Sequence, residues 1–461
     1  MAGATTDVDL LLRHGRVITM DAHRRILVDG AIAIRAGRIV AAGPDREVST
    51  RFRAKAVRDL AARIVHPGFV DAHTHMGMEL VRAIGPKTSR KWSMLENAVF
   101  STQTYEQEYL GSLLSCMEMA ANGTTTFADT GSSFFLDATA KAIETVGLRG
   151  LVGHLICDVP GEVEAIVSPT ETCLARLDDQ LGRYPFHSDA KVRCAVSVSG
   201  MGMCSDRVLV EARKLAEHHR VPMIMHQSWG DDEVQASLAR DGRRPVEHLG
   251  ELGVLGPGLA LVHMIHLDER EVGLVARAGA AVVHCPAAAI RRAMGVIRRG
   301  LFPEMLRAGI VVALGSDGIS GKRDLARQVY MAATLFREVR DDLTAITGEI
   351  ALEMATINGA RALGLEGEVG SLEAGKRADL VIHGFDRPEA HPRRKDPVDT
   401  LVFYTGSRTV QTVLVDGDVV FDNGRLTRLD AEEALGRIDT SGARLEDHLG
   451  AATFSAWPLV E

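Results

Sequence analysis

The sequence predicts an α/β fold: a (β/α)8 barrel of the TIM type, with a small β-sandwich domain built from both chain ends. Two observations predict it. Eight apolar, strand-like segments alternate with amphipathic helical segments between residues 64 and 368, as in a closed parallel barrel. Short alternating strands occur before and after this region, and a chain of 461 residues is long enough for both parts.

The N-terminal segment, residues 1–63, alternates apolar and polar residues in GRVITMD and AIAIRAGRIVAAG, with turn residues between the runs. Such period-two runs predict short antiparallel strands. The same alternation of apolar and polar residues occurs again in residues 378–384 and 409–426. We therefore expect residues 1–63 and 369–429 to form one composite β-sandwich domain.

The middle segment, residues 64–368, holds the predicted barrel. Its strands are expected at residues 64–72, 124–130, 150–156, 192–199, 222–227, 259–265, 280–286 and 311–317. Apolar residues recur at spacings of three and four in residues 206–219 and 268–279, which predicts helices there. An open doubly wound sheet is the alternative. The Gly-rich phosphate loop that would point to a function for that fold is absent after the early strands of the sequence.

The last segment, residues 430–461, is predicted to be a C-terminal tail. It reads as a polar amphipathic helix followed by an apolar end, AWPLVE. We expect this tail to dock either against a neighbouring subunit or against its own barrel. Barrels of this kind are often assembled from several copies, so we expect a homo-oligomer whose number of subunits the residues do not fix.

Composition excludes several classes of partner. A net charge of −8 and a pI near 6.1 disfavour nucleic acid, which binds to clustered positive charge. The densest basic group, Arg291, Arg292, Arg298 and Arg299, is interpreted as a solvated helix face, although Arg291 and Arg292 follow a strand end and could reach a pocket. No apolar run approaches the roughly 18 residues of a membrane span, and the six cysteines form no CxxC pair. We expect a cytoplasmic protein that acts on a small molecule.

Polar residues gather where the predicted strands end. In VHPGFVDAHTHM, His73 and His75 are two residues apart, so a strand would direct both imidazoles to one side. Histidine or aspartate also ends four other strands, at His226, His263 with His266, His284, and Asp317. One such histidine is more often a core residue, but together on one barrel rim they predict a metal site.

These residues resemble the metal-dependent amidohydrolase superfamily, in particular its deaminase and chlorohydrolase branch. The resemblance is carried by PGFVDAHTH, His226, LVHMIHLDE, HCP, GSDG and GSLEAGKRADLVI, and it covers nearly the whole chain. It implies a divalent metal bound by His73, His75, His226 and Asp317. It also implies that Asp317 and His263 are catalytic groups, and that the protein is a hydrolase of C–N bonds other than peptide bonds.

The expected cofactor is one divalent ion per subunit. Three imidazoles and a carboxylate suit Zn²⁺ first, and also Fe²⁺, Co²⁺ or Mn²⁺. Relatives with two metals bridge them by a carboxylated lysine at the end of the fourth strand. Here that strand ends in Val196–Ser199, and Lys191 lies at its opposite end. In the implied mechanism, hydroxide generated on the metal attacks the substrate, Asp317 moves the proton and His263 polarises the attacked oxygen.

Two departures from the branch bear on the substrate. A glutamate three residues after the fifth-strand histidine protonates the ring in the deaminases, but Trp229 stands there, and Ala287–Ala289 replace the Ser-Asn pair that usually follows HCP. We therefore expect attack on the carbonyl of an amide, urea, carbamate or thiocarbamate, best an aryl urea, since the chain is similar to phenylurea and thiocarbamate (molinate) hydrolases. Substrate contacts are expected from Trp229, Trp92, Met76 and His284.

Three alternatives stay open. The protein could be an aminohydrolase or chlorohydrolase of a nitrogen heterocycle, triazine, guanine-like or cytosine-like, with Asp231, Asp232 or Glu233 supplying the missing proton. A barrel that serves only assembly is disfavoured because all four metal ligands are present. His266 and His284 either orient ligands or face the core.

Overall fold

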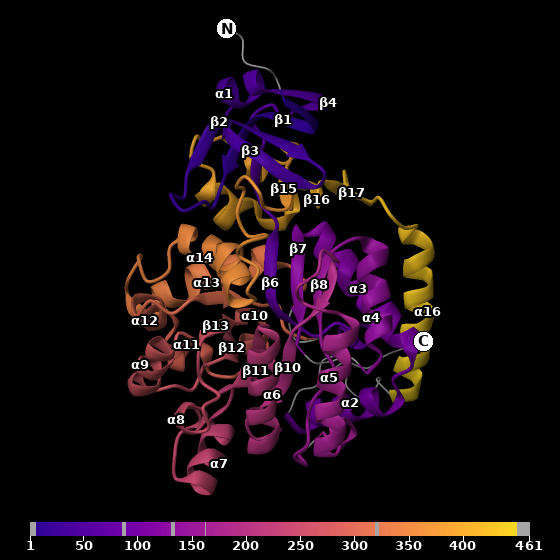
Figure 1. The fold of residues 1–461 in the computed structure, drawn as a ribbon, viewed down its shortest axis with the longest axis vertical. Helices are drawn as coiled ribbons and strands as arrows, with labels where there is room; N and C mark the ends of the chain where they lie inside the picture. The colour runs from indigo at the N-terminus through magenta and orange to yellow at the C-terminus, as the bar shows by residue number, and fades with distance from the viewer. Residues whose placement is uncertain (1–5, 85–88, 131–133, 162, 319–321, 450–461) are drawn as a thin grey trace, which may run out of the picture.

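The computed structural model describes residues 6–84, 89–130, 134–161, 163–318 and 322–449. Figure 1 shows a sheet domain at one end of the molecule and the larger α/β part beside it. The apolar end AWPLVE of the tail lies outside the described residues. None of the helices in the described ranges is long and apolar enough to span a membrane.

Both chain ends contribute strands to one nine-stranded sheet, in the order β18-β17-β16-β15-β5-β1-β2-β3, with β4 paired to β1. The union of the ends was expected from sequence, but pairing joins all nine strands in one sheet, and a sandwich of two stacked sheets is not confirmed. The strands are β1 (Thr6–Ile18), β2 (Ile26–Arg35), β3 (Arg38–Pro44), β4 (Phe52–Asp59), β5 (Ile64–Pro67), β15 (Leu380–His383), β16 (Val410–Val415), β17 (Asp418–Asp422) and β18 (Arg425–Leu426).

The first predicted barrel strand is divided at Gly68. Residues before it form β5, which pairs with β1 and β15, and residues after it form β6 (Phe69–Thr74). A Cβ on Gly68 would lie 2.1 Å from Oγ1 of Thr125, so only glycine allows this close approach. The chain therefore passes from the terminal sheet into the α/β part at one residue.

The remaining strands form two parallel arcs. They are β6–β7–β8–β9 and β10–β11–β12–β13–β14, with β7 (Thr124–Asp129), β8 (Arg149–Val152), β9 (Val192–Cys194), β10 (Val196–Gly200), β11 (Met223–Gln227), β12 (Leu259–His263), β13 (Ala281–His284) and β14 (Val312–Leu314). Only Ala195 separates β9 from β10, and one bridge, Thr74 to Asp317, joins β6 to the segment after β14. The arrangement is barrel-like, but the expected continuous ring of hydrogen-bonded strands is not formed.

The helices begin and end at ordinary sequence signals. The predicted helix 206–219 is α6, capped by the Ser205 side chain, and the predicted helix 268–279 is α9, capped by Asp268 and ended by Gly279. The α-helices of the described residues are α1 (Asp45–Arg51), α2 (Ser89–Thr102), α3 (Tyr105–Ala121), α4 (Leu136–Val146), α5 (Thr170–Arg183), α6 (Asp206–His219), α7 (Asp231–Asp241), α8 (Pro245–Glu251), α9 (Glu269–Ala278), α10 (Pro286–Arg291), α11 (Val296–Arg299), α12 (Phe302–Arg307), α13 (Leu325–Arg340), α14 (Gly348–Met354), α15 (Ile357–Ala362) and α16 (Ala431–Leu449).

The tail helix α16 lies against its own barrel. It runs beside α3 and buries Ala434, Ile438 and Leu445 on one face (Figure 1). Arg437 donates to Glu106 of α3 at 2.5 Å. Of the two docking sites left open by the sequence, the described part of the tail uses the subunit's own surface.

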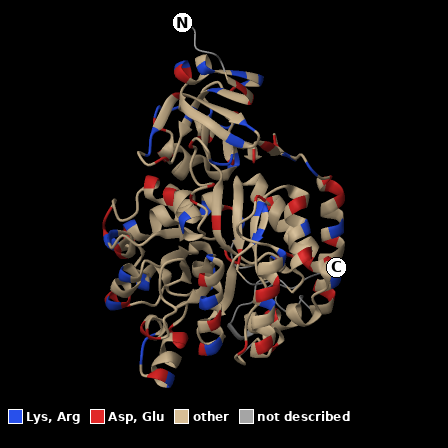
Figure 2. Ribbon diagram, viewed as in Figure 1, with Lys and Arg blue, Asp and Glu red and all other residues tan. Residues whose placement is uncertain are grey.

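Charged residues of both signs are interspersed along the outer helices in the view of Figure 2. Two of the four arginines named above have acidic partners on other helices. Arg292 pairs with Glu96 of α2 at 2.6 Å, and Arg299 lies 3.8 Å from Asp231 of α7. The exposed Arg298 and Arg299 agree with the solvated-face interpretation, whereas the half-buried Arg292 points to the other possibility, a role at a pocket.

Candidate metal centre

Four histidines and one aspartate from distant parts of the chain meet at the carboxyl ends of the barrel strands. Nε2 of His73 and Nε2 of His75 each lie 3.5 Å from Oδ1 of Asp317. Nε2 of His226 lies 3.2 Å from Nε2 of His75. The ring of His263 completes the group, with its centroid 5.7 Å from that of His73 and 5.6 Å from that of His226.

The strand ends hold these side chains through unusual backbone. Asp317 donates its N–H to the carbonyl of His73 at 2.9 Å, which ties the segment after β14 to β6. Asp317 and His263 have φ angles of 65° and 76°, a left-handed region that residues with a Cβ rarely adopt. Such strain persists only where surrounding contacts fix it, and it is concentrated at functional sites.

His226 has one defined tautomer when neutral. Its Nδ1 lies 2.8 Å from the carbonyl oxygen of Ser199, which can only accept, so Nδ1 carries the proton. Nε2 then presents a lone pair toward His75. Burial, followed by the effect of the nearby His73, lowers the pKa of His226 to about 4, so the ring is neutral at pH 7.

Three further members, His75, His263 and Asp317, have the charge states that a cation site requires. Burial, followed by the effect of neighbouring imidazoles, holds the pKa of His75 well below its ordinary value. Burial also lowers the pKa of His263 well below that value. Burial opposes the charge on Asp317, but the contact with His73 and the nearby imidazoles outweigh it and hold its pKa well below the usual range.

The residues present fit a divalent cation. Nε2 of His73 and Oδ2 of Asp317 are buried without a hydrogen-bond partner among the described residues. Buried polar atoms are normally paired, so two such atoms on neighbouring residues fit a cation as their partner. Neutral imidazole nitrogens and a carboxylate oxygen are ligands of zinc and its first-row neighbours. The cluster therefore combines the right donors, protonation states and unsatisfied atoms.

Three supporting residues were missed by the sequence reasoning. The hydroxyl of Thr130 is hydrogen-bonded to Nδ1 of His73, and Asp71 accepts the N–H of Ser316 at 2.9 Å. The buried Arg323 donates to the backbone carbonyls of His75 and Asp317. Thr130 ends a predicted strand and was within reach of the rule used for the histidines, whereas Arg323 ends no predicted strand and has no pattern that identifies it.

Three residues are buried or engaged elsewhere: His284 and Met76, which were expected to contact substrate, and His266, which was expected either to orient ligands or to face the core. His284 stacks on Phe302 with ring centroids 3.8 Å apart, so of its two open roles the structure favours the core. His266 lies with Nε2 2.9 Å from the carbonyl of Met294. Met76 is buried in the main core, where its carbonyl accepts the hydroxyl of Ser115. Their roles toward a substrate stay predictions.

The two predicted tryptophans differ in surroundings. Trp92 of α2 lies under the guanidinium groups of Arg291 and Arg292, at 5.7 and 4.8 Å from the ring centroid. Arg292 follows α10, so this contact joins the segments after β6 and β13. Trp229 directly follows the left-handed Ser228 after β11 and is half-buried.

Glu233 holds the loop that contains Trp229. Its carboxylate accepts the N–H groups of Ser228 and Trp229, both at 2.9 Å, and a side-chain N–H of Gln227. Burial raises the pKa of Glu233 to about 7, while these donors favour the charged form. Since both oxygens are engaged, Glu233 fits a loop-fixing role better than that of a proton donor to a substrate.

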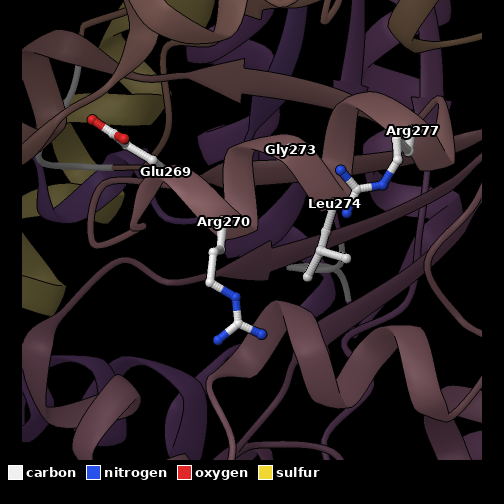
Figure 3. Close-up of a pocket in the computed structure, with 5 residues that line it drawn as sticks. All are labelled: Glu269, Arg270, Gly273, Leu274 and Arg277. Carbon is white, nitrogen blue, oxygen red and sulfur yellow. The ribbon is translucent and has the colours of Figure 1, made fainter.

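A shallow hollow elsewhere does not overlap the cluster. Figure 3 shows that it is lined by side chains of α9, including Arg270, Leu274 and Arg277. These residues are all on the outer helix that follows β12. The convergent cluster at the strand ends, and not this hollow, is the candidate site.

Comparison with known proteins gives three results. A model of the amidohydrolase family matches residues 64–420. A 5-methylthioadenosine/S-adenosylhomocysteine deaminase from Syntrophobacter fumaroxidans is 35% identical over 446 residues, which is 93% of this chain and 97% of that protein. A protein of the same name from Symbiobacterium thermophilum is 32% identical over 449 residues, 95% of this chain and 99% of that one.

Solved structures resemble the whole chain. An adenosine deaminase from Xanthomonas campestris with bound zinc matches with a TM-score of 0.88 at 28% identity, covering 97% of this chain and all of that one. The zinc complex of atrazine chlorohydrolase from Arthrobacter aurescens matches with a TM-score of 0.83, covering 95% of this chain and 99% of that one. At 24% identity the second likeness concerns the fold alone.

Proposed function

The chain belongs to the amidohydrolase family and is a hydrolase of C–N bonds other than peptide bonds; from this premise we propose that it deaminates an amino-substituted nitrogen heterocycle. The substrate class proposed first is a 6-aminopurine nucleoside with a thioether substituent. The relatives named for such deaminations are similar over more than nine-tenths of this chain, which supports this choice. It replaces the expected aryl urea as the first candidate.

The proposal depends on one observation: His73, His75, His226 and Asp317 converge with two buried, unpartnered ligand atoms. We propose that these four residues hold one divalent ion per subunit. Zinc is the first choice because the adenosine deaminase structure described above contains it and because imidazole and carboxylate donors suit this ion. When bound, such an ion supplies a Lewis acid that lowers the pKa of water from 15.7 to about 7.

The protein's own groups then move the proton. The carboxylate of Asp317, with its partnerless Oδ2, accepts a proton from the attacking water and delivers it to the departing nitrogen. His263, neutral and at the end of β12, is placed to orient the reacting water or the developing oxyanion. Water oxygen bonds to the ring carbon, the C–N bond breaks, and ammonia leaves as the ring becomes an oxo compound.

A side-by-side substrate screen tests this proposal. The zinc-loaded protein is incubated with 5-methylthioadenosine, S-adenosylhomocysteine, adenosine, aminotriazines, aryl ureas and anilides, and products are identified by mass spectrometry. We expect conversion of an amino to an oxo group with release of ammonia. Asp317→Asn is the control and should give no product even where metal is retained. Conversion of no amino heterocycle would refute the proposal.

A second candidate is hydrolysis of an acyclic carbonyl in an amide, urea, carbamate or thiocarbamate. It is favoured by Trp229, which stands where the resembling deaminases carry a proton-donating glutamate. Glu233 is engaged by the loop, so it does not restore that acid. Loss of a general acid typically costs 10²–10⁴-fold. Release of an aniline from aryl ureas in the same screen would select this candidate.

A further inference from the structure

Arg323 makes an unusual set of contacts beneath the candidate metal centre. Its guanidinium donates to the carbonyl oxygen of Asp317, to the carbonyl oxygen of His75 at 2.6 Å and to the Ser316 hydroxyl at 3.2 Å. The same group pairs with Glu79 at 2.6 Å. The Arg323 side chain is only 1% exposed, so these contacts are made away from solvent.

These contacts cross the junction between β6 and β14, called the seam below, where the two strands are joined most weakly. Among the described residues, β6 and β14 share no ladder, and their ends are joined by the bridge between Thr74 and Asp317 and by side-chain hydrogen bonds beside it. His75 and Asp317 lie on opposite sides of that seam, just past the ends of their strands. The planar guanidinium provides several N–H donors in fixed directions, so one side chain can hold both carbonyls.

The geometry of the ligands depends on the backbone that Arg323 holds. Asp317 has the left-handed φ of 65°, and its carboxylate oxygen lies 3.5 Å from Nε2 of His75. A small rotation of either residue would separate these ligand atoms. Glu79 offsets the buried charge of Arg323 and is itself held by Arg82. The guanidinium is therefore held both by the carbonyl oxygens and by Glu79.

We propose that Arg323 is a positioning residue that sets metal affinity by clamping the backbones of His75 and Asp317. The inference rests on the ligand set proposed above. It predicts that a change at Arg323 weakens metal binding even though its side chain touches none of the ligand atoms. Outer-shell groups of this kind typically contribute 10–100-fold to metal affinity.

The chain offers a matched control. Arg149 is also fully buried and pairs with two carboxylates, Asp379 at 3.4 Å and Asp416 at 2.8 Å. These partners belong to the segments around β15 and β16, not to the candidate centre. Arg323→Lys and Arg149→Lys each keep a positive charge but lose the planar fork, so both should lower thermal stability.

The experiment measures metal affinity of the full-length protein by competition with a chromophoric chelator, together with the visible spectrum of the Co²⁺ form. Arg323→Lys should weaken Zn²⁺ binding about 10–100-fold and change the Co²⁺ bands. Arg149→Lys should leave both at wild-type values while its melting temperature falls. Equal affinities and identical spectra in the two variants would overturn the inference.

A second variant covers the case in which Arg323→Lys does not fold. Glu79→Gln removes the counter-charge that fixes the guanidinium and should also weaken Zn²⁺ binding and alter the Co²⁺ spectrum. Wild-type affinity in Glu79→Gln would contradict the inference. Failure of the wild-type protein to bind metal would instead refute the ligand set, so the two failures are distinguishable.

Discussion

The hydroxyl of Thr130, at the end of β7, is hydrogen-bonded to Nδ1 of His73 at the end of β6. A neutral histidine that offers Nε2 to a cation carries its proton on Nδ1, and here that N–H has Oγ1 as its acceptor. The segment just after β7 thus holds the ring orientation of one proposed ligand.

Thr130→Val removes this acceptor while keeping the side-chain shape. We expect Zn²⁺ affinity to fall about 10-fold, since outer-shell partners fix the ligand's orientation. Thr130→Ser keeps the hydroxyl and should bind as the wild type does. Chelator competition measures both, and wild-type affinity in Thr130→Val together with weakening in Thr130→Ser would mean that packing of the methyl group, not the hydrogen bond, matters.

Trp229 provides a test of the reaction class. Trp229→Glu places a carboxyl group three residues after His226, where the resembling deaminases have their proton donor. If the protein acts on an amino heterocycle, kcat/KM for that substrate should rise about 10-fold or more, within the range of general-acid catalysis. Trp229→Gln is the control and should show no gain, whereas a fall in both variants would favour a substrate-packing role for the indole.

Glu233 is expected to act on stability and not on proton transfer. Glu233→Ala leaves the N–H groups of Ser228 and Trp229 without their acceptor, so the free energy of unfolding should fall by about 2–3 kcal/mol. Asp231→Asn changes a more exposed carboxylate and should leave stability within about 0.5 kcal/mol. Urea denaturation measures both; a stable Glu233→Ala with lost turnover would restore Glu233 as the missing acid.

A buried histidine pair makes the terminal sheet sensitive to acid. Nδ1 of His66 lies 2.7 Å from the carbonyl of Pro67, so it donates, and Nε2 of His66 accepts from Nε2 of His383 at 2.9 Å. Nδ1 of His383 then accepts from Thr409 at 2.8 Å. This chain of hydrogen bonds requires both rings to be neutral. Burial lowers the pKa of His66 to about 4 and that of His383 well below its ordinary value.

The sign of the pH dependence follows from these shifts. The unfolded chain binds the proton more tightly than the folded one, so the contribution is complete above the unfolded pKa of 6.5 and is lost as pH falls toward 4. For His66 the difference corresponds to about 3 kcal/mol at most. Urea unfolding at pH 8 and pH 5 should show this loss, and His383→Asn should reduce it. An unchanged difference in the variant would exclude the pair as its source.

Local signals in the sequence were sufficient for many elements but not for their long-range contacts. The helix predicted at residues 206–219 matches α6, because Ser205 caps it and its apolar spacing is regular. The strand predicted at residues 64–72 is two strands, because Gly68 must pass close to Thr125, a residue far along the chain. Closure of the barrel likewise depends on pairing between β6 and β14, which no local pattern reports.

The candidate site shows the same division. The histidines and Asp317 could be predicted because each ends an apolar strand, and strand ends of one barrel meet at one face. Arg323 could not be predicted, because its proposed role depends on two backbone carbonyl oxygens. One belongs to Asp317, which is near in sequence, and the other belongs to His75, which is more than 240 positions away. Burial of His284 against Phe302 was equally open, since a strand residue faces the barrel interior or the helices with little difference in sequence.

The most direct test of the central claim is titration of the metal-free protein with Zn²⁺, followed by metal analysis of the purified complex. The account predicts one tightly bound equivalent per subunit, lost in His226→Ala. Two equivalents in active protein would contradict the single-ion site, and undiminished binding in His226→Ala would show that the ligands of the ion lie elsewhere.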